Sequence, residues 1–204
     1  MKKNILTSIF IAASLLVWGV ANGQPFPLRL TVGNESTAIP FTRFFTVPVH
    51  PSVQAGTDFT YRSRPHSTFY QTVNLGYVFH NYLYQGLWVN TEAGYDYKFG
   101  FGLNLKAMLG VGYLHTFATR QEYQFKDGEY VGGTDWGNPR LMVTLALGAG
   151  FRIQKDKEDS PEVFILYKPW IEYPYSPGFI PVMTHITLEA GIRYPIRFKK
   201  ECNE

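Results

Sequence analysis

The sequence predicts an all-β fold, a single eight-stranded antiparallel transmembrane β-barrel preceded by a cleaved signal peptide. Three observations carry this prediction. Charged residues make up only 17% of the 204 residues and aromatic residues another 17%, whereas soluble domains carry about 25% charged residues. The mean hydropathy is nevertheless −0.14, which is too low for a helical membrane protein. Apolar and polar residues alternate with a period of two over segments longer than the ~5–6 residues of an average strand.

The first 23 residues have the three parts of a secretory signal peptide. Lys2 and Lys3 supply positive charge, residues 5–20 are apolar, and Ala21-Asn22-Gly23 places small residues before a cleavage site at Gln24. An uncleaved membrane anchor is the alternative, but the apolar run is short. We therefore expect a signal peptide over 1–23, a barrel with external loops over 24–198 and a C-terminal tail over 199–204.

Eight alternating segments are the expected strands. Seven of them reach the ~9–11 residues that a transmembrane strand needs, and the first is shorter and weaker. The expected strands are Pro27–Gly33, Ser52–Ser63, Thr68–Asn81, Leu83–Tyr97, Phe101–Ala118, Arg140–Gln154, Glu162–Tyr173 and Val182–Phe198. The segment Thr37–Pro51, which contains Phe41, Phe44 and Phe45, fits a loop, an interfacial segment or a chain inside the lumen.

Each expected strand has an apolar and a polar face. The apolar faces carry no Asp, Glu, Lys or Arg, and the strand glycines fall on the polar faces. A soluble β-sandwich also alternates, but it would place many more charges on its wet face. Small residues suit the crowded interior of a small barrel. We therefore expect the apolar face to meet lipid and the polar face to line a confined lumen.

The polar faces carry twelve charged residues that we expect to form a charge network in the lumen. They are Arg29, Asp58, Arg62, Glu92, Asp96, Lys106, Arg152, Lys168, Glu172, Glu189, Arg193 and Arg197. An acid–base site built from the carboxylates of this set with His80 or His185 is the functional alternative. An eight-stranded barrel is only just wide enough for its own side chains, and buried charges must be paired. We therefore favour a paired charge network over an acid–base site. A lumen filled in this way also argues against an open pore.

The connections are short at one end of the expected barrel and longer at the other, as in membrane barrels with short periplasmic turns and long external loops. The expected turns are 64–67, 98–100 and 155–161, and the external loops are 34–51, 119–139 and 174–181, with a brief turn near 81–82. Asp127-Gly128 is a hairpin signal, so we expect the 119–139 loop to extend as a two-stranded ribbon. Its candidate recognition residues are Tyr123, Phe125, Tyr130 and Trp136.

The sequence contains no established catalytic or cofactor motif. Gly-x-Ser-x-Gly, His-Glu-x-x-His and Gly-rich phosphate loops are missing, and His66-Ser67 falls in an expected turn. The five histidines show no metal-ligand spacing, so we predict no metal, no cofactor and no catalytic residue. Cys202 is the single cysteine, which excludes a disulfide framework. Beyond the leader the sequence contains 17 basic and 16 acidic residues. This near balance of charge gives nucleic-acid binding little support.

These features resemble the small eight-stranded outer-membrane barrels of Gram-negative bacteria. The leader ending before Gln24 and the stretch Thr46–Pro51 leading into Val53–Tyr61 are similar to uncharacterised barrels of the Bacteroidota. The resemblance covers nearly the whole mature chain. It implies an outer-membrane location, contact with outer-membrane lipid and lipopolysaccharide, and insertion by the barrel-assembly machinery. Many such barrels end in an aromatic residue, whereas here Phe198 is followed by residues 199–204.

Enzymes also occur among the barrels that the chain resembles, including lipid A deacylases and palmitoyl transferases, phospholipases and proteases. The deacylase pattern places His, Ser and Asn close together near the end of a late strand, whereas His185 is followed here by Ile186-Thr187. We therefore expect a role in envelope structure or in binding an envelope partner through the external loops, without an enzymatic site. A lipid-modifying enzyme and a narrow channel are the two alternatives.

Overall fold

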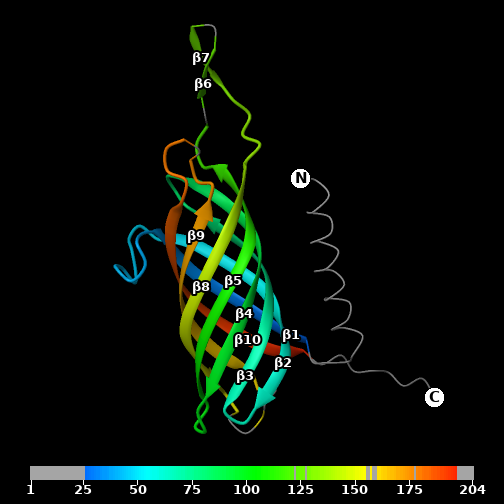
Figure 1. Cartoon of the computed structure of the whole chain (residues 1–204). Coiled ribbons are helices and arrows are strands. Elements are labelled where there is room, and N and C mark those ends of the chain that lie inside the picture. Colours follow the sequence, from blue (N-terminus) through cyan, green and yellow to red (C-terminus); the bar gives the residue numbers. More distant parts are fainter. Residues whose placement is uncertain are drawn as a thin grey trace, which may run out of the picture.

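The protein folds as a closed antiparallel barrel in a computed structural model that describes residues 26–121, 123–126, 128–154, 157, 160–176 and 178–196. Eight strands close in the order β1-β10-β9-β8-β5-β4-β3-β2, and β6 and β7 form a separate ribbon (Figure 1). The strands are β1 Phe26–Thr37, β2 His50–Arg64, β3 Ser67–Phe79, β4 Tyr84–Lys98, β5 Leu103–Ala118, β6 Tyr123–Lys126, β7 Glu129–Gly132, β8 Asn138–Arg152, β9 Glu162–Tyr173 and β10 Met183–Ile196. The predicted eight-stranded barrel is confirmed. The expected signal peptide and the tail 199–204 lie outside the described residues.

The first strand is longer than its alternation indicates. It continues past Gly33 to Thr37, and β2 begins at His50 instead of Ser52. Asn34 explains the extension, because its side-chain amide donates to the Thr46 carbonyl at 2.9 Å and accepts from the backbone N–H of His50 at 2.8 Å. These bonds hold the two strands together beyond the point where the sequence pattern fades.

The outer wall is apolar, as the alternation predicts. In β5, the outward residues Leu109 and Val111 are 62% and 52% exposed, whereas the inward Met108 is 2% exposed. Exposed Leu, Val, Ile, Phe or Tyr side chains lie on every one of the eight barrel strands. Soluble monomers rarely expose a contiguous apolar surface of this extent, so the wall is suited to lipid.

The lumen contains large apolar side chains in addition to the expected polar ones. One buried cluster comprises Val78, Tyr84, Trp88, Leu114, Met142 and Trp170. A second comprises Tyr70, Met108, Ala146, Phe164 and Leu166. These residues occupy inward positions among the charged residues and help to fill the interior.

Two of the lumen rings lie directly over glycines of a neighbouring strand. Gly76 pairs with Trp88, and Gly94 pairs with Tyr70, across the β3–β4 ladder. A Cβ atom at Gly94 would lie 2.5 Å from the Tyr70 ring, and one at Gly76 would overlap the Trp88 ring. Aromatic coverage of strand glycines is a known device for pinning the register of a sheet. It accounts for the inward glycines at positions 76 and 94.

We expect Gly76→Ala to lower the free energy of unfolding by about 1–3 kcal/mol, because the added methyl group overpacks the Trp88 ring. Gly100→Ala is the matched control, since a Cβ atom there meets nothing within 4 Å. Guanidinium unfolding of the two variants in lipid vesicles measures the difference. Equal stabilities would show that the Trp88 ring moves away without cost.

The connection between β1 and β2, residues 38–49, lies outside the barrel (Figure 1). The backbone N–H of Phe41 donates to the Tyr167 hydroxyl at 2.7 Å, and that hydroxyl donates to the Arg43 carbonyl at 3.1 Å. The rings of Phe41 and Phe44 lie 5.4 and 5.0 Å from the Tyr167 ring. Tyr167 has the outward parity of Ile165 on β9. Of the three interpretations of this segment, a chain inside the lumen is therefore wrong.

We expect the tip of this connection to enter the lipid phase, because Ile39, Phe45 and Val47 are 68%, 58% and 83% exposed beside an apolar wall. An NBD fluorophore on Phe45→Cys, with Cys202→Ser, is expected to emit strongly in vesicles and to be quenched by nitroxide-labelled acyl chains. The same fluorophore on Tyr130→Cys in the β6–β7 ribbon serves as the control and should escape quenching. Equal, water-like emission at both sites would exclude lipid contact at Phe45.

Candidate functional site

Charged side chains from different strands meet inside the barrel. The Lys106 ammonium lies 2.6 Å from Asp96 and 2.5 Å from Glu162. The Tyr70 hydroxyl donates to Asp96 at 2.8 Å, and the Asn104 amide donates to Glu162 at 3.1 Å. Each carboxylate therefore has a cation and a neutral donor, which is what burial of a charge requires.

A second network surrounds Lys168 of β9. Its ammonium lies 3.4 Å from Glu92 and 3.1 Å from Glu189, and the Thr144 hydroxyl donates to Glu92 at 2.9 Å. The cavity beside Lys168 and Trp170 has a volume of about 10 Å³, which is about the space for one water molecule. At this level the side chains fill the lumen.

Most of the charged residues predicted to face the lumen are buried there. Asp58 accepts a hydrogen bond from the partly exposed Arg193 at 2.7 Å and lies 3.6 Å from Arg29. Arg152 is also partly exposed, and Arg197 lies outside the described residues. The buried members of the predicted set are Arg29, Asp58, Glu92, Asp96, Lys106, Lys168, Glu172 and Glu189.

Arg62 is the member of the predicted set that the structure places elsewhere. A β-bulge shifts the β2–β3 register between Thr60 and Arg62, so that Arg62 pairs with the outward-facing Phe69. A bulge adds one residue to one strand and reverses the parity of everything beyond it. Arg62 is consequently exposed, and its assignment to the lumen is wrong.

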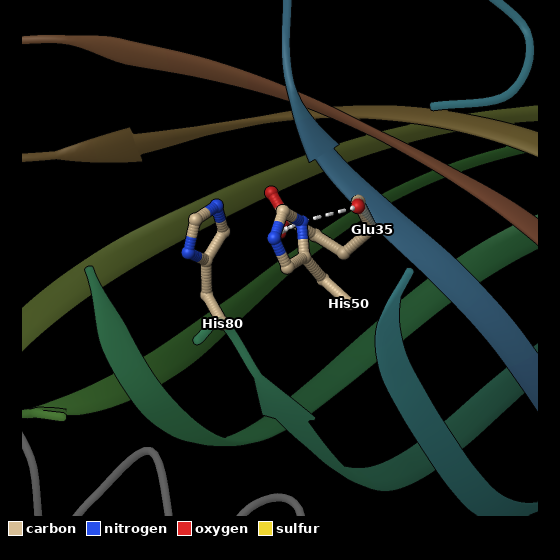
Figure 2. A group of neighbouring side chains, drawn as sticks. All are labelled: Glu35, His50 and His80. Atoms are coloured by element: carbon tan, nitrogen blue, oxygen red, sulfur yellow. Dashed lines mark hydrogen bonds and ion pairs between the residues drawn. The ribbon is translucent and has the colours of Figure 1, made fainter. Parts of the chain in front are cut away.

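At the end of the barrel that carries the longer loops, three strands bring a carboxylate and two imidazoles together (Figure 2). Glu35 of β1 pairs with His50 of β2, and His80 directly follows β3. Oxygen and nitrogen atoms from the three side chains all lie within 4.8 Å of one another, and all three residues are buried. The imidazole rings of His50 and His80 stack with centroids 3.6 Å apart.

His185 of β10 connects this group to a second carboxylate. Its Nδ1 lies 2.7 Å from Glu35 and its Nε2 lies 3.2 Å from Glu172, while Arg140 lies 2.7 Å from the other oxygen of Glu172. The Trp170 ring stacks on His185 at 4.0 Å. Both nitrogens of His185 therefore face carboxylates, and the hydroxyls of Thr37 and Tyr84 lie 3.5 Å from its Nδ1.

The hydrogen bonds of His80, in the turn after β3, are those of a neutral imidazole. Its Nδ1 accepts the backbone N–H groups of Tyr82 and Leu83 at 3.3 and 3.2 Å. Burial lowers the pKa of His80 below its ordinary value, because the charged imidazolium loses hydration there. Neutral imidazole and carboxylate together are ligands for a metal cation and do not form a nucleophile–base pair.

The sequence interpretation missed part of this group. Glu35 and His50 lie beyond the expected ends of their strands, and the length of the first hairpin hides that they pair. The predicted strand that begins at Arg140 gives that residue no partner, and the predicted lumen set does not include Glu162. Extending the inward parity from Gly33 to Glu35, and from Ser52 to His50, identifies Glu35 and His50 as inward residues.

Beyond the same end of the barrel, β6 and β7 form the ribbon that Asp127-Gly128 predicts (Figure 1). Phe125 and Tyr130 pack edge-to-face at 5.2 Å, and Asp135 anchors the base by accepting from the backbone of Ala118 at 2.5 Å. Aromatic side chains are exposed along this loop. They are Tyr123, Phe125, Tyr130 and Trp136.

Comparison with known proteins shows similarity of fold. The crystal structure of Neisserial surface protein A aligns with a TM-score of 0.53 at 9% identity, over 84% of this chain and 97% of that chain. The outer-membrane enzyme PagL aligns with a TM-score of 0.48 at 12% identity, over 83% and 99%. Ail of Yersinia pestis aligns with a TM-score of 0.45 at 11% identity, over 84% and 99%.

No protein-family model matches the sequence, and a search of curated proteins found no match. In the part of the chain that the structure describes, no helix is long and apolar enough to cross a membrane. Its strand topology and its similarity to Neisserial surface protein A show that the chain is a closed eight-stranded antiparallel barrel of the kind found in small outer-membrane proteins.

Proposed function

We propose that the chain is an integral outer-membrane β-barrel that binds an envelope partner through its external loops. In this proposal residues 1–23 direct export, the barrel-assembly machinery inserts the barrel, and its wall contacts outer-membrane lipid and lipopolysaccharide. The exposed apolar side chains on all eight barrel strands support the membrane location, because such a wall gains most from lipid contact.

The observation that carries the binding role is the β6–β7 ribbon, which projects beyond the barrel (Figure 1). It exposes Tyr123, Phe125 and Tyr130, and aromatic side chains are enriched at protein interfaces. The lumen argues against a channel for ions and so favours the binding role, because Lys168 and its two carboxylates occupy the interior. Planar-bilayer recordings of the purified protein are therefore expected to show no sustained conductance.

Photo-cross-linking in cells tests the binding role. A photoreactive amino acid at Tyr130, which is 75% exposed, is expected to give a discrete adduct with an envelope protein or polysaccharide. The matched control is Phe101, which is 61% exposed in the turn at the opposite end of the barrel. If Tyr130 gives no adduct, or only an adduct that Phe101 also gives, recognition through the ribbon is refuted.

Replacing residues 123–132 with a short Gly-Ser linker provides a second test. The variant is expected to lose co-purification of the partner in mild detergent while keeping the heat-modifiable migration of a folded barrel. Lipid A and phospholipid acyl chains should be the same in cells with and without the protein. A reproducible change in those acyl chains would instead identify a lipid-modifying enzyme.

A further inference from the structure

We propose that Glu35, His50 and His80 form a binding site for a divalent transition-metal cation of the Zn²⁺ class at the outer end of the lumen. The three residues lie on or directly after neighbouring strands, and their ligand atoms lie within 4.8 Å of one another (Figure 2). Zn²⁺ binds imidazole nitrogen and carboxylate oxygen at about 2.0–2.2 Å. The site is independent of the loop interaction proposed above.

The His50 imidazole is prepared to bind a metal. Its Nδ1 lies 3.2 Å from the backbone carbonyl of Glu35, and because a carbonyl only accepts, Nδ1 must carry the proton. The lone pair of the neutral ring is therefore on Nε2, which is buried and has no hydrogen-bond partner. A backbone carbonyl that fixes the tautomer in this way is the usual support of a metal-binding histidine.

The Glu35 carboxylate provides the second ligand. Its Oε2 is buried without a hydrogen bond and lies 3.9 Å from His50 Nδ1. Its Oε1 contacts His185 at 2.7 Å, which orients the carboxylate as an outer-shell partner does in metal sites. Each of the two residues thus offers one buried atom that could ligate a cation and that has no hydrogen-bond partner.

His80 provides the third ligand through a local rearrangement. Its Nδ1 now accepts the amides of Tyr82 and Leu83, so the proton of the neutral ring is on Nε2. Binding through either nitrogen requires the ring to leave those amides. We infer that metal binding repositions the turn 80–83 and brings the three ligand atoms to the spacing of a coordination shell.

Calorimetric titration of Zn²⁺ into the folded, detergent-solubilised protein, made without a polyhistidine tag, tests the site. We expect one equivalent to bind, and Co²⁺ in its place to give an absorption spectrum of imidazole and carboxylate coordination. His50→Ala and Glu35→Gln should abolish saturable binding. His185→Gln should weaken it about 10–100-fold, the effect of losing an outer-shell partner.

His66→Ala is the matched control, because His66 is exposed in the turn at the opposite end of the barrel, and it should bind as the wild type does. Heat modifiability on unboiled gels verifies that each variant is folded. Where a variant does not fold, the Co²⁺ spectrum of the wild type decides. Absence of saturable wild-type binding, or its persistence in folded His50→Ala, would overturn the proposal.

Discussion

Lys168→Met is expected to destabilise the barrel by about 3–5 kcal/mol, the range found when one partner of a buried ion pair is removed. Lys168 is 2% exposed and contacts Glu92 and Glu189, which are 1% and 3% exposed. Methionine preserves the apolar stem and removes the ammonium, so two carboxylates would be left in the lumen without their cation. Guanidinium unfolding in lipid vesicles measures the loss.

A second variant separates charge from packing. Neutralising the two carboxylates as well, in Lys168→Met/Glu92→Gln/Glu189→Gln, is expected to restore much of the lost stability, because no unpaired charge then remains. Exposed Lys157 provides the control, and Lys157→Met should leave unfolding unchanged. If Lys168→Met unfolds as the wild type does, the lumen is wet enough to hydrate both carboxylates, and the side-chain-filled interior is contradicted.

Leu109→Arg is expected to cost about 2–4 kcal/mol in a bilayer, the range for a cation on the lipid face near the midplane of a membrane barrel. Leu109 is 62% exposed and lies near the centre of β5. In water the same exposed position would accept arginine with little effect. The size of the loss in vesicles therefore reports whether the wall meets lipid.

Val131→Arg is the matched control for this substitution, because Val131 is 51% exposed on the β6–β7 ribbon, outside the barrel wall. It should change the stability by less than about 0.5 kcal/mol, as surface substitutions do. Equal, small effects of the two substitutions would show that Leu109 faces water.

The barrel was predictable because alternation is a local property of each strand. Once the period of two is found, every residue of a regular strand is assigned to a face, as Leu109 and Met108 show. Arg62 marks the limit of this approach. A bulge inserts one residue without a clear sequence signal, and here it turned Arg62 to the opposite face.

The group of Glu35, His50 and His80 depends on pairing between strands, which alternation within one strand does not fix. Glu35 and His50 are neighbours because β1 and β2 extend beyond the alternating pattern, where Asn34 bonds to Thr46 and His50. Histidines separated by 30 residues show no metal-ligand spacing, yet adjacent strands place His50 and His80 in contact. The sequence interpretation therefore lacked the register between neighbouring strands.

The membrane-spanning wall is tested most directly by nitroxide labels on the outward residues of β5, introduced one at a time as cysteines with Cys202→Ser. Labels at Leu105, Leu109 and Tyr113, which are 49%, 62% and 50% exposed, sample successive heights of the wall. In vesicles, the ratio of collisions with oxygen to collisions with a water-soluble nickel complex should peak at Leu109. A label at Leu109 as accessible to the nickel complex as one at Tyr130 would contradict a membrane-spanning barrel.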